Sequence, residues 1–333
     1  MYKVILLLLP AICISNLSQA QLPDSLKTHI DSAFHFMQRS LYSKRVNWDA
    51  EKTAAYAAAA TVANKEALFP IIANVYKKLD DHHGWFEQYN DKIRLPWKDS
   101  RQPTEAIKKE WAKGPKVAAF MIGNIAYLRI PGMHVYNQQQ IDYCANWLAD
   151  SVQSLAAKKP KGWIIDLRLN TGGNIVPMMS GIASFFPEGI LSYYLDRNDK
   201  AVSEAVIKNK VYVQEDTIKA NLKKALPDLS KQKVAVLIGR STGSSGEGVA
   251  YNFMNRKNTR LFGENSAGVA NATEGFLFND QQSYFLLTTS QLGNKNKKPA
   301  PETLKPHVQV PVNDNFETPA NDLTVKEALK WLK

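Results

Sequence analysis

Cysteine is nearly absent from this chain, and the absence narrows its chemistry. The 333 residues include two cysteines, Cys13 and Cys144. Cys13 falls in an N-terminal stretch that we expect to be removed, so the mature chain keeps only Cys144 and forms no internal disulfide. Apart from the His82–His83 pair, no cluster of histidine, glutamate and cysteine has the spacing of metal ligands, and His307 stands alone. We therefore expect no metal site.

Long hydrophobic runs are also missing, apart from one at the N-terminus. MYKVILLLLPAICISNLSQA, residues 1–20, has a lysine near its start, an apolar run to about Ile14 and a small-x-small end at Ala20. This pattern predicts a secretory signal peptide cut after Ala20, and hence a periplasmic or secreted protein. The alternative is an uncleaved membrane anchor, but the run is shorter than the ~20 residues of a spanning helix. We expect no stable membrane insertion after cleavage.

The charge balance is basic, but the basic residues are not arranged for nucleic acid. The net charge is +11, and the lysines are scattered apart from one cluster, NKNKK at 294–298. No basic helix carries interleaved aromatic residues, so we expect no nucleic-acid partner. We interpret the excess as a surface property that favours solubility and a weak attraction to anionic envelope polymers.

The chain divides into a helical part and an α/β part. Residues 21–95 predict an N-terminal helical subdomain with three helices, the third broken or kinked at Pro70. Residues 96–116 contain three prolines and predict a linker. From 117 to 333 short apolar strands alternate with amphipathic helices, which predicts an α/β core. The clearest strands are expected at 162–168, 233–239, 259–263 and 283–292.

The turn after the strand at 233–239 could hold a nucleophile. RSTGSSGEGVAY, residues 240–251, leads from that strand into a helix. A serine there is exposed at a strand end, lies near the positive end of a helix and has small neighbours that let a substrate approach. Ser244 and Ser245 are both candidates. The alternative is a Ser/Gly-rich loop that caps a helix.

Two further segments supply the other parts of a hydrolytic site. KKLDDHHGWF, residues 77–86, has two histidines after two aspartates, so one histidine could act as the base. The pair could also be half a metal site, or two surface side chains. GWIIDLRLNTGGN, residues 162–174, ends a strand in two glycines whose bare N–H groups could receive an oxyanion. The alternative there is a tight turn, with Asp166 and Arg168 as a structural ion pair.

These segments together resemble one family. DLRLNTGG resembles the D-L-R-x-N-x-G-G signature of the C-terminal-processing (tail-specific) serine peptidases and their tricorn-core relatives. KVAVLIGRSTGSSGEGVAY resembles the segment that holds the family's nucleophile, and RLFGENSAG resembles the glycine turn that follows it. The chain is identified as a member over about 117–333. The resemblance implies a crotonase/Clp-like stacked ββα core, a peptide or protein substrate and no cofactor.

The resemblance also assigns the site residues. The family's serine lies three residues before a glutamate, here Glu247, so the nucleophile is Ser244. The lysine of the bacterial Ser–Lys members is missing, because Gly268-Val269-Ala270 stands in its place. The tricorn-like branch uses instead a histidine in an L-x-D-x-H segment, which gives His83, with His82 as the alternative. A C-terminal glutamate of that branch matches Glu302.

The implied oxyanion donors are the N–H groups of Gly172 or Gly173 and of Ser245. About 25 residues separate the helical segment from the first core strand, too few for a PDZ domain, so the organisation resembles compact nisin-resistance-type proteases. Three other interpretations stay open. The chain could be an inactive member that binds a hydrophobic or peptide ligand, an esterase with the same nucleophile, or a basic envelope-binding protein without an active site.

Overall fold

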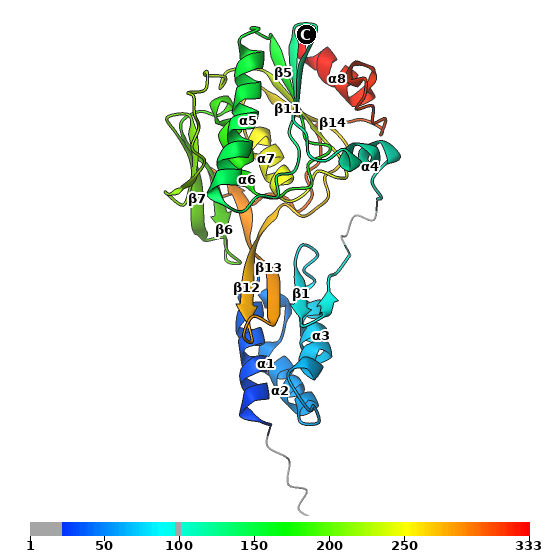
Figure 1. Cartoon of the computed structure of the whole chain (residues 1–333), viewed down its shortest axis with the longest axis vertical. Coiled ribbons are helices and arrows are strands. Elements are labelled where there is room, and N and C mark those ends of the chain that lie inside the picture. The colour runs from blue at the N-terminus through cyan, green and yellow to red at the C-terminus, as the bar shows by residue number, and fades with distance from the viewer. Residues whose placement is uncertain (1–21, 97–100) are drawn as a thin grey trace, which may run out of the picture.

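The fold is mixed α/β with helices of the N-terminal part at one end, as the sequence predicts (Figure 1). The computed structural model describes residues 22–96 and 101–333. The predicted signal peptide, 1–20, lies outside the described residues. Within the described ranges no helix combines the length and the apolar character needed to cross a membrane.

A six-stranded sheet forms the centre of the larger part. Its strand order is β14-β11-β10-β5-β4-β3, and all neighbours are parallel except the β3–β4 pair. The strands β4, β5 and β10 are buried along their whole length, which explains their uninterrupted apolar sequences. The strands are β3 Ala118–Ile122, β4 Ile125–Arg129, β5 Gly162–Asp166, β10 Val234–Ile238, β11 Thr259–Gly263 and β14 Val308–Gln309.

Helices cover both faces of this sheet. On one face Trp163 and Ile165 of β5 belong to a core shared with α5 (Gln138–Ala156), α6 (Ile175–Gly181) and α7 (Ser245–Met254). On the other face Ile164 packs in a core with α8 (Leu323–Leu332). Because β5 and β10 are parallel neighbours, their carboxyl ends lie side by side, and the segments that follow them meet at one edge of the sheet.

A second sheet, antiparallel throughout, links this core to the N-terminal helices. Its order is β2-β1-β13-β6-β7-β8-β9, with β12 also paired to β13. The long β13 pairs with β1 through residues 283–286 and with β6 through residues 291–294. Its strands are β1 Trp85–Gln88, β2 Asp91–Ile93, β6 Gly189–Leu195, β7 Ala201–Lys208, β8 Val211–Gln214, β9 Ile218–Lys219, β12 Asn271–Phe278 and β13 Ser283–Asn294.

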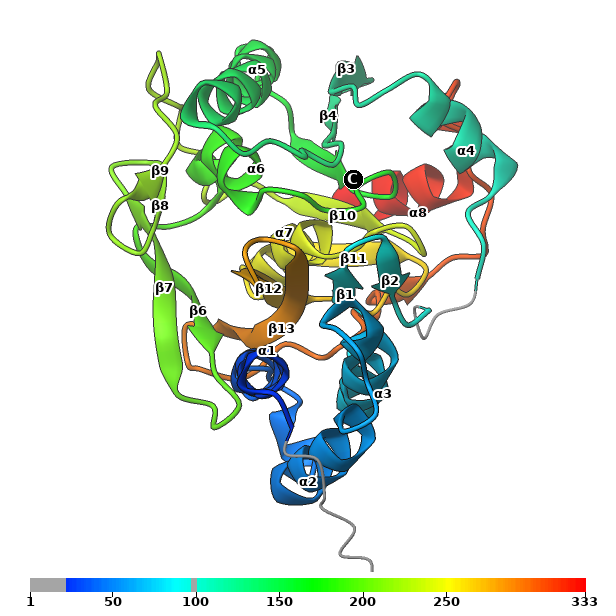
Figure 2. The ribbon, with the colours of Figure 1, turned by 60° about the horizontal axis from the view of Figure 1, so that its bottom comes forward.

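The N-terminal helices are α1 (Asp24–Met37), α2 (Trp48–Ala59) and α3 (Phe69–Leu79). Pro70 does not kink α3 but lies in its first turn, where a missing N–H costs no intrahelical bond. These helices pack on phenylalanines of the second sheet, including Phe276 and Phe285, and α1 lies beside β12 (Figure 2). The N-terminal helical part therefore shares its core with strands from the C-terminal half of the chain.

The predicted linker at 96–116 carries a helix of its own, α4 (Glu105–Ala112). Thr104 caps it by accepting a hydrogen bond from the Ile107 N–H at 3.3 Å. Ile107 is buried in a small cluster with Leu169 and Phe316 of the core. The segment is thus anchored against the edge of the six-stranded sheet rather than only connecting two parts.

Candidate active site

The strand β5 ends in a buried ion-pair network. The Arg168 guanidinium donates to Asp166 at 2.7 Å and to Asp322 at 2.7 Å, and it also faces Asp314 at 3.3 Å. The Tyr127 hydroxyl donates to Asp166 at 2.6 Å. Asp166 and Arg168 thus form a structural ion pair that ties the end of β5 to the segment that begins α8.

The next turn presents two glycines to the nucleophile loop. Gly172 and Gly173 have φ values of +109° and +107°, which residues with a side chain rarely adopt. A Cβ on Gly172 would lie 2.7 Å from the Cβ of Ser244, so only glycine fits there. The Gly172 N–H donates to the Asn170 side chain at 2.9 Å. The Gly173 N–H has no acceptor among the hydrogen bonds of the described residues. Of the two predicted donors, Gly173 is the one left available.

Ser244 stands immediately before α7 in a strained backbone conformation. Its φ is 51° and its ψ is −122°, values outside the regions that residues other than glycine usually occupy. Such a turn between strand and helix is typical of exposed nucleophiles. Ser245 is the first residue of α7, so its N–H has no intrahelical acceptor. The Ser245 hydroxyl donates to the Gly173 carbonyl at 2.6 Å, which joins the two loops.

Glu247 holds the nucleophile turn in place. Its carboxylate accepts from the N–H groups of Ser244 at 2.9 Å and of Gly268 and Val269 at 3.0 Å. The Ser266 hydroxyl donates to it as well. Burial raises the pKa of Glu247 to about 7, although these four donors act in the opposite direction. The Gly268–Val269 segment is thus tied, through Glu247, to the candidate nucleophile.

Asp81 fixes the backbone around His83. Helix α3 ends at Leu79, and the left-handed Asp80 turns the chain toward the second sheet. The buried Asp81 carboxylate accepts from the His83 N–H at 3.1 Å and the Gly84 N–H at 3.0 Å. It also accepts from the N–H and hydroxyl of Thr288, each at 2.8 Å. Four hydrogen bonds therefore anchor the histidine turn to β13.

The two histidines differ in what their rings contact. Nε2 of His82 lies 2.7 Å from an Asp80 carboxylate oxygen, and its Nδ1 contacts the Pro96 carbonyl. Both ring nitrogens of His82 are thus engaged. Nδ1 of His83 is buried and has no partner in the described part of the chain. This difference favours His83 over His82 as a proton acceptor.

The surroundings of His83 keep its ring neutral. Burial lowers the pKa of His83 to about 4, against the raising effects of the Asp81 charge and of the Asn271 backbone. The Asn271 side chain donates to the Tyr42 hydroxyl at 2.9 Å. Asn271 also lines a cavity of about 340 Å³ together with Gly173, Ser244 and Ser245. The candidate nucleophile and the candidate base thus meet the same short segment.

Glu302 is exposed in the loop before β14. Its charge, like that of Asp81, acts on the Tyr42 phenol, whose pKa rises to about 12 mainly through burial. The negative charge that acts on His83 itself comes from Asp81.

Sequence reasoning did not single out three of these contributors. Asp81 stands in the LDDHH segment, but its bond to Thr288 spans 207 positions and leaves no local signal. The contact between Tyr42 and Asn271 spans 229 positions.

The cavity at Ser244 is lined by no lysine, and no group of His, Cys, Asp and Glu in the described ranges could hold a metal ion.

Comparison with known proteins places the chain in a family. The chain is 25% identical to the nisin-resistance protein of Lactococcus lactis subsp. lactis over 293 residues, 88% of this chain and 82% of the relative. Two solved structures share the fold: a lipoprotein from Streptococcus agalactiae (TM-score 0.65, 20% identity, 99% of both chains) and the photosystem II D1 C-terminal processing protease (TM-score 0.59, 12% identity, 86% of this chain and 93% of the other). The model of peptidase family S41 matches residues 124–310, and the chain therefore belongs to this family of serine peptidases.

Proposed function

We propose that this chain is an exported serine peptidase that hydrolyses peptide bonds with Ser244 as the nucleophile and His83 as its base. The observation that carries the proposal is the Ser244 turn. The serine has φ 51° at the start of α7 and lies directly against Gly172. Backbone strain of this kind costs about 1–3 kcal/mol and persists only where the surrounding structure enforces it. Here Glu247 and the glycine loop do so.

In the proposed reaction His83 takes the proton of the Ser244 hydroxyl as the oxygen attacks a peptide carbonyl. A ring with a pKa near 4 is neutral at pH 7 and can accept that proton. The oxyanion forms between the N–H groups of Gly173 and Ser245, which have no other acceptor in the described residues. Each such donor typically stabilises the transition state by ~3 kcal/mol. The imidazolium then gives its proton to the leaving amine as the peptide C–N bond breaks, which leaves the acyl group as an ester on Ser244. His83 next takes a proton from a water that attacks this ester, and returns it to Ser244 as the acid product leaves.

The charged imidazole needs a stabilising partner in this reaction. We assign that role first to Asp81, because its carboxylate holds the His83 turn and raises the pKa of the ring. Glu302, which the family resemblance suggests, acts at longer range in this proposal, through its field at Tyr42. Tyr42 and Asn271 hold the segment that the imidazole faces.

Export and a peptide substrate complete the proposal. The N-terminal 20 residues have the pattern of a cleavable signal, which supports a periplasmic or secreted enzyme. Proteins with a similar fold include a putative peptidase from Parabacteroides merdae (TM-score 0.61, 15% identity, 92% of this chain and 96% of the other) and the processing protease above. This likeness supports a peptide or protein as the substrate class.

The test is cleavage of a diverse peptide library by the protein that begins at Gln21, followed by mass spectrometry. Small p-nitrophenyl esters are assayed in parallel. We expect peptide cleavage by the wild type, none by Ser244→Ala and none by His83→Ala, whereas His82→Ala keeps most of the activity. Turnover of esters without peptide cleavage would replace the peptidase with an esterase. Binding of peptides without cleavage of any substrate would indicate an inactive family member.

A further inference from the structure

We propose that a second cavity, next to the active site, binds a large apolar substrate side chain together with a neighbouring carboxylate. This inference rests on the proposed peptidase function, because it names the kind of peptide that the site selects. The cavity lies between α4, the segment 113–116 that follows it, and α5. We call it the α4–α5 cavity.

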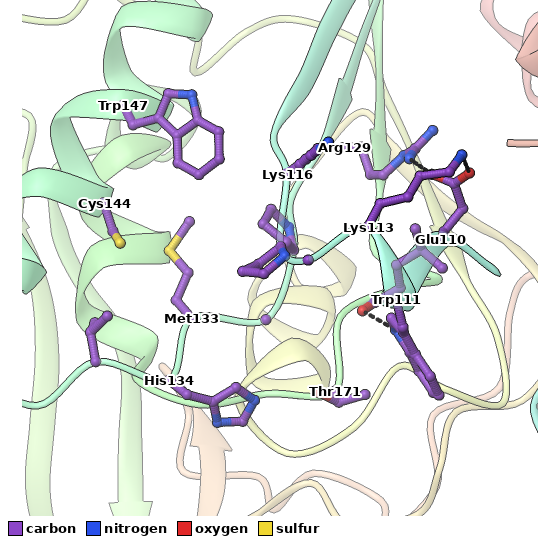
Figure 3. Close-up of a pocket in the computed structure, with 16 residues that line it drawn as sticks. Glu110, Trp111, Lys113, Lys116, Arg129, Met133, His134, Cys144, Trp147 and Thr171 are labelled. Carbon is purple, nitrogen blue, oxygen red and sulfur yellow. Dashed lines mark hydrogen bonds and ion pairs between the residues drawn. The ribbon is translucent and has the colours of Figure 1, made fainter. Parts of the chain in front are cut away.

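The α4–α5 cavity has a volume of about 490 Å³, enough for a large side chain. Figure 3 shows Trp147 and Cys144 of α5 on one side, and Trp111 on the other, with Met133 and His134 along one edge. Most of the lining is apolar, and it also includes Pro115, Pro131, Val135 and Leu169. The Trp111 indole N–H donates to the Leu169 carbonyl at 3.1 Å, so the α4 wall is fixed before any ligand enters.

The α4–α5 cavity touches the back of the oxyanion loop. Gly132 and Thr171 line it, and a Cβ on Gly132 would lie 2.9 Å from the Gly172 carbonyl oxygen. On its other side Gly172 lies against Ser244. The Met133 N–H donates to the same carbonyl at 3.0 Å. Because an extended peptide advances about 3.3 Å per residue, a side chain only a few residues from the scissile bond reaches this cavity.

The rim of the α4–α5 cavity is positively charged. Lys113 and Lys116 are exposed there, the buried Arg129 lines the cavity farther in, and Glu110 is the one carboxylate among the lining residues. Glu110 is already paired with Arg129 at 3.1 Å and with Lys113. Lys116 is exposed and makes no ion pair with another described residue. An apolar interior with a net positive rim complements a ligand that has an apolar body and an anionic end.

That chemistry fits a peptide with a large apolar residue beside a carboxylate. The carboxylate has two possible sources, the free C-terminus of the peptide or an aspartate or glutamate side chain. The first cavity, at Ser244, differs because its lining has no lysine or arginine. Thr171 lines the α4–α5 cavity and Gly173 lines the first cavity, so two neighbouring parts of one turn face them and they would hold different portions of one substrate.

Cys144 allows binding to be measured without catalysis. It lines the α4–α5 cavity and is the only cysteine after residue 20. The experiment uses the Ser244→Ala protein from Gln21 onward and follows alkylation of Cys144 by N-ethylmaleimide with intact-mass spectrometry. Four acetylated tripeptides are added as competitors: Ala-Ala-Phe acid, Ala-Ala-Ser acid, Ala-Ala-Phe amide and Ala-Phe-Asp amide.

We expect Ala-Ala-Phe acid to protect Cys144 at a concentration about tenfold lower than the serine peptide or the phenylalanine amide. Equal protection by Ala-Phe-Asp amide would mean that the cavity binds any nearby carboxylate. If that peptide does not protect Cys144, the bound group is the free C-terminus. Lys116→Glu, at an exposed position, should remove the preference for acid over amide. Trp147→Ala should weaken all phenylalanine peptides about fivefold.

Tyr143→Ala is the matched control, because Tyr143 lies on the same helix, is 70% exposed and does not line this cavity. Equal protection by all four peptides, no protection by any, or an unchanged acid preference in Lys116→Glu would overturn the proposal. If peptides protect Cys144 while the wild type cleaves nothing, the catalytic proposal fails and the α4–α5 cavity stands as a binding site. If the wild type cleaves peptides without regard to an apolar residue or a carboxylate, the catalytic proposal stands and the proposed role of the α4–α5 cavity fails.

Discussion

The candidate nucleophile and the candidate base are held in different ways. Ser244 is fixed by groups of the six-stranded sheet and the turns that leave it: Glu247 bonds its N–H, and Gly172 packs on its side chain. His83 is fixed by Asp81, which anchors its turn to Thr288 of the second sheet. The contacts that hold the proposed nucleophile thus come from the core, whereas those that hold the proposed base join the end of α3 to β13. Substitutions in the two regions should therefore differ in their effects on activity and on stability.

The largest effect is expected from Gly172→Ala. The added Cβ meets Ser244 at 2.7 Å, so the nucleophile must move, and peptidase activity should fall by at least ~10³-fold. Gly189→Ala is the matched control, because Gly189 has a similar φ of +105° but no atom within 4 Å of its Cβ position. It should cost about 1–2 kcal/mol of stability and keep activity. Equal losses of activity in both variants would show that backbone strain, not the clash, is responsible.

Glu247→Ala should destabilise the core side strongly. The change leaves four donors without their acceptor, among them the Ser244 N–H, and should lower the free energy of unfolding by about 3 kcal/mol or more. Urea denaturation measures this loss. Glu327→Ala is the control, since Glu327 forms an exposed ion pair with Lys330 at 2.6 Å and should cost at most about 1 kcal/mol. Similar costs for both would contradict the role given to Glu247.

Asp81→Asn should impair the base while it leaves the nucleophile region intact. We expect kcat to fall about 30–100-fold, with little change in KM, because the ring loses the charge that stabilises its protonated form. Glu302→Gln is the matched change of the other carboxylate and should cost less than about fivefold. The kcat and KM of both variants on one cleaved peptide provide the comparison. A larger loss in Glu302→Gln would transfer the orienting role to Glu302.

The smallest expected effect is the contribution of His83 to the pH dependence of the free energy of unfolding. The pKa of His83 is about 4 in the folded chain and 6.5 as a reference value. As the pH falls below 6.5, the unfolded chain takes up a proton that the folded chain does not, so this contribution is complete above pH 6.5 and is lost toward pH 4. His83 should therefore lower the free energy of unfolding by about 2 kcal/mol between pH 7 and pH 5. Urea midpoints at both values should show a smaller drop in His83→Gln than in the wild type.

The core could be predicted from sequence more completely than the second sheet. The strands β5 and β10 lie in continuous apolar runs between small or polar residues, and β11 coincides with the short strand expected at 259–263. The strands β6 to β9 were not predicted, because their partly exposed, mixed sequences depend on pairing with neighbours. Helix α4 was missed because prolines on both sides of it suggested a linker.

The candidate site shows the same division. Ser244 and the glycine loop follow from local motifs, since each lies within a few residues of the strand that positions it. The surroundings of His83 do not, because Asp81, Thr288, Tyr42 and Asn271 come together only in the folded chain. The Gly172 N–H donates to Asn170, so the Gly173 N–H is the one left for an oxyanion. This difference depends on the geometry of the turn and cannot be predicted from residue spacing.

The most direct test of an activated Ser–His pair is intact-mass labelling of the protein that begins at Gln21 with a fluorophosphonate. The wild type is compared with Ser244→Ala, His83→Ala and His82→Ala at equal concentration and pH. The account predicts one adduct on the wild type and on His82→Ala, and none on Ser244→Ala or His83→Ala. An adduct that persists in Ser244→Ala, or one that requires His82 rather than His83, would contradict it.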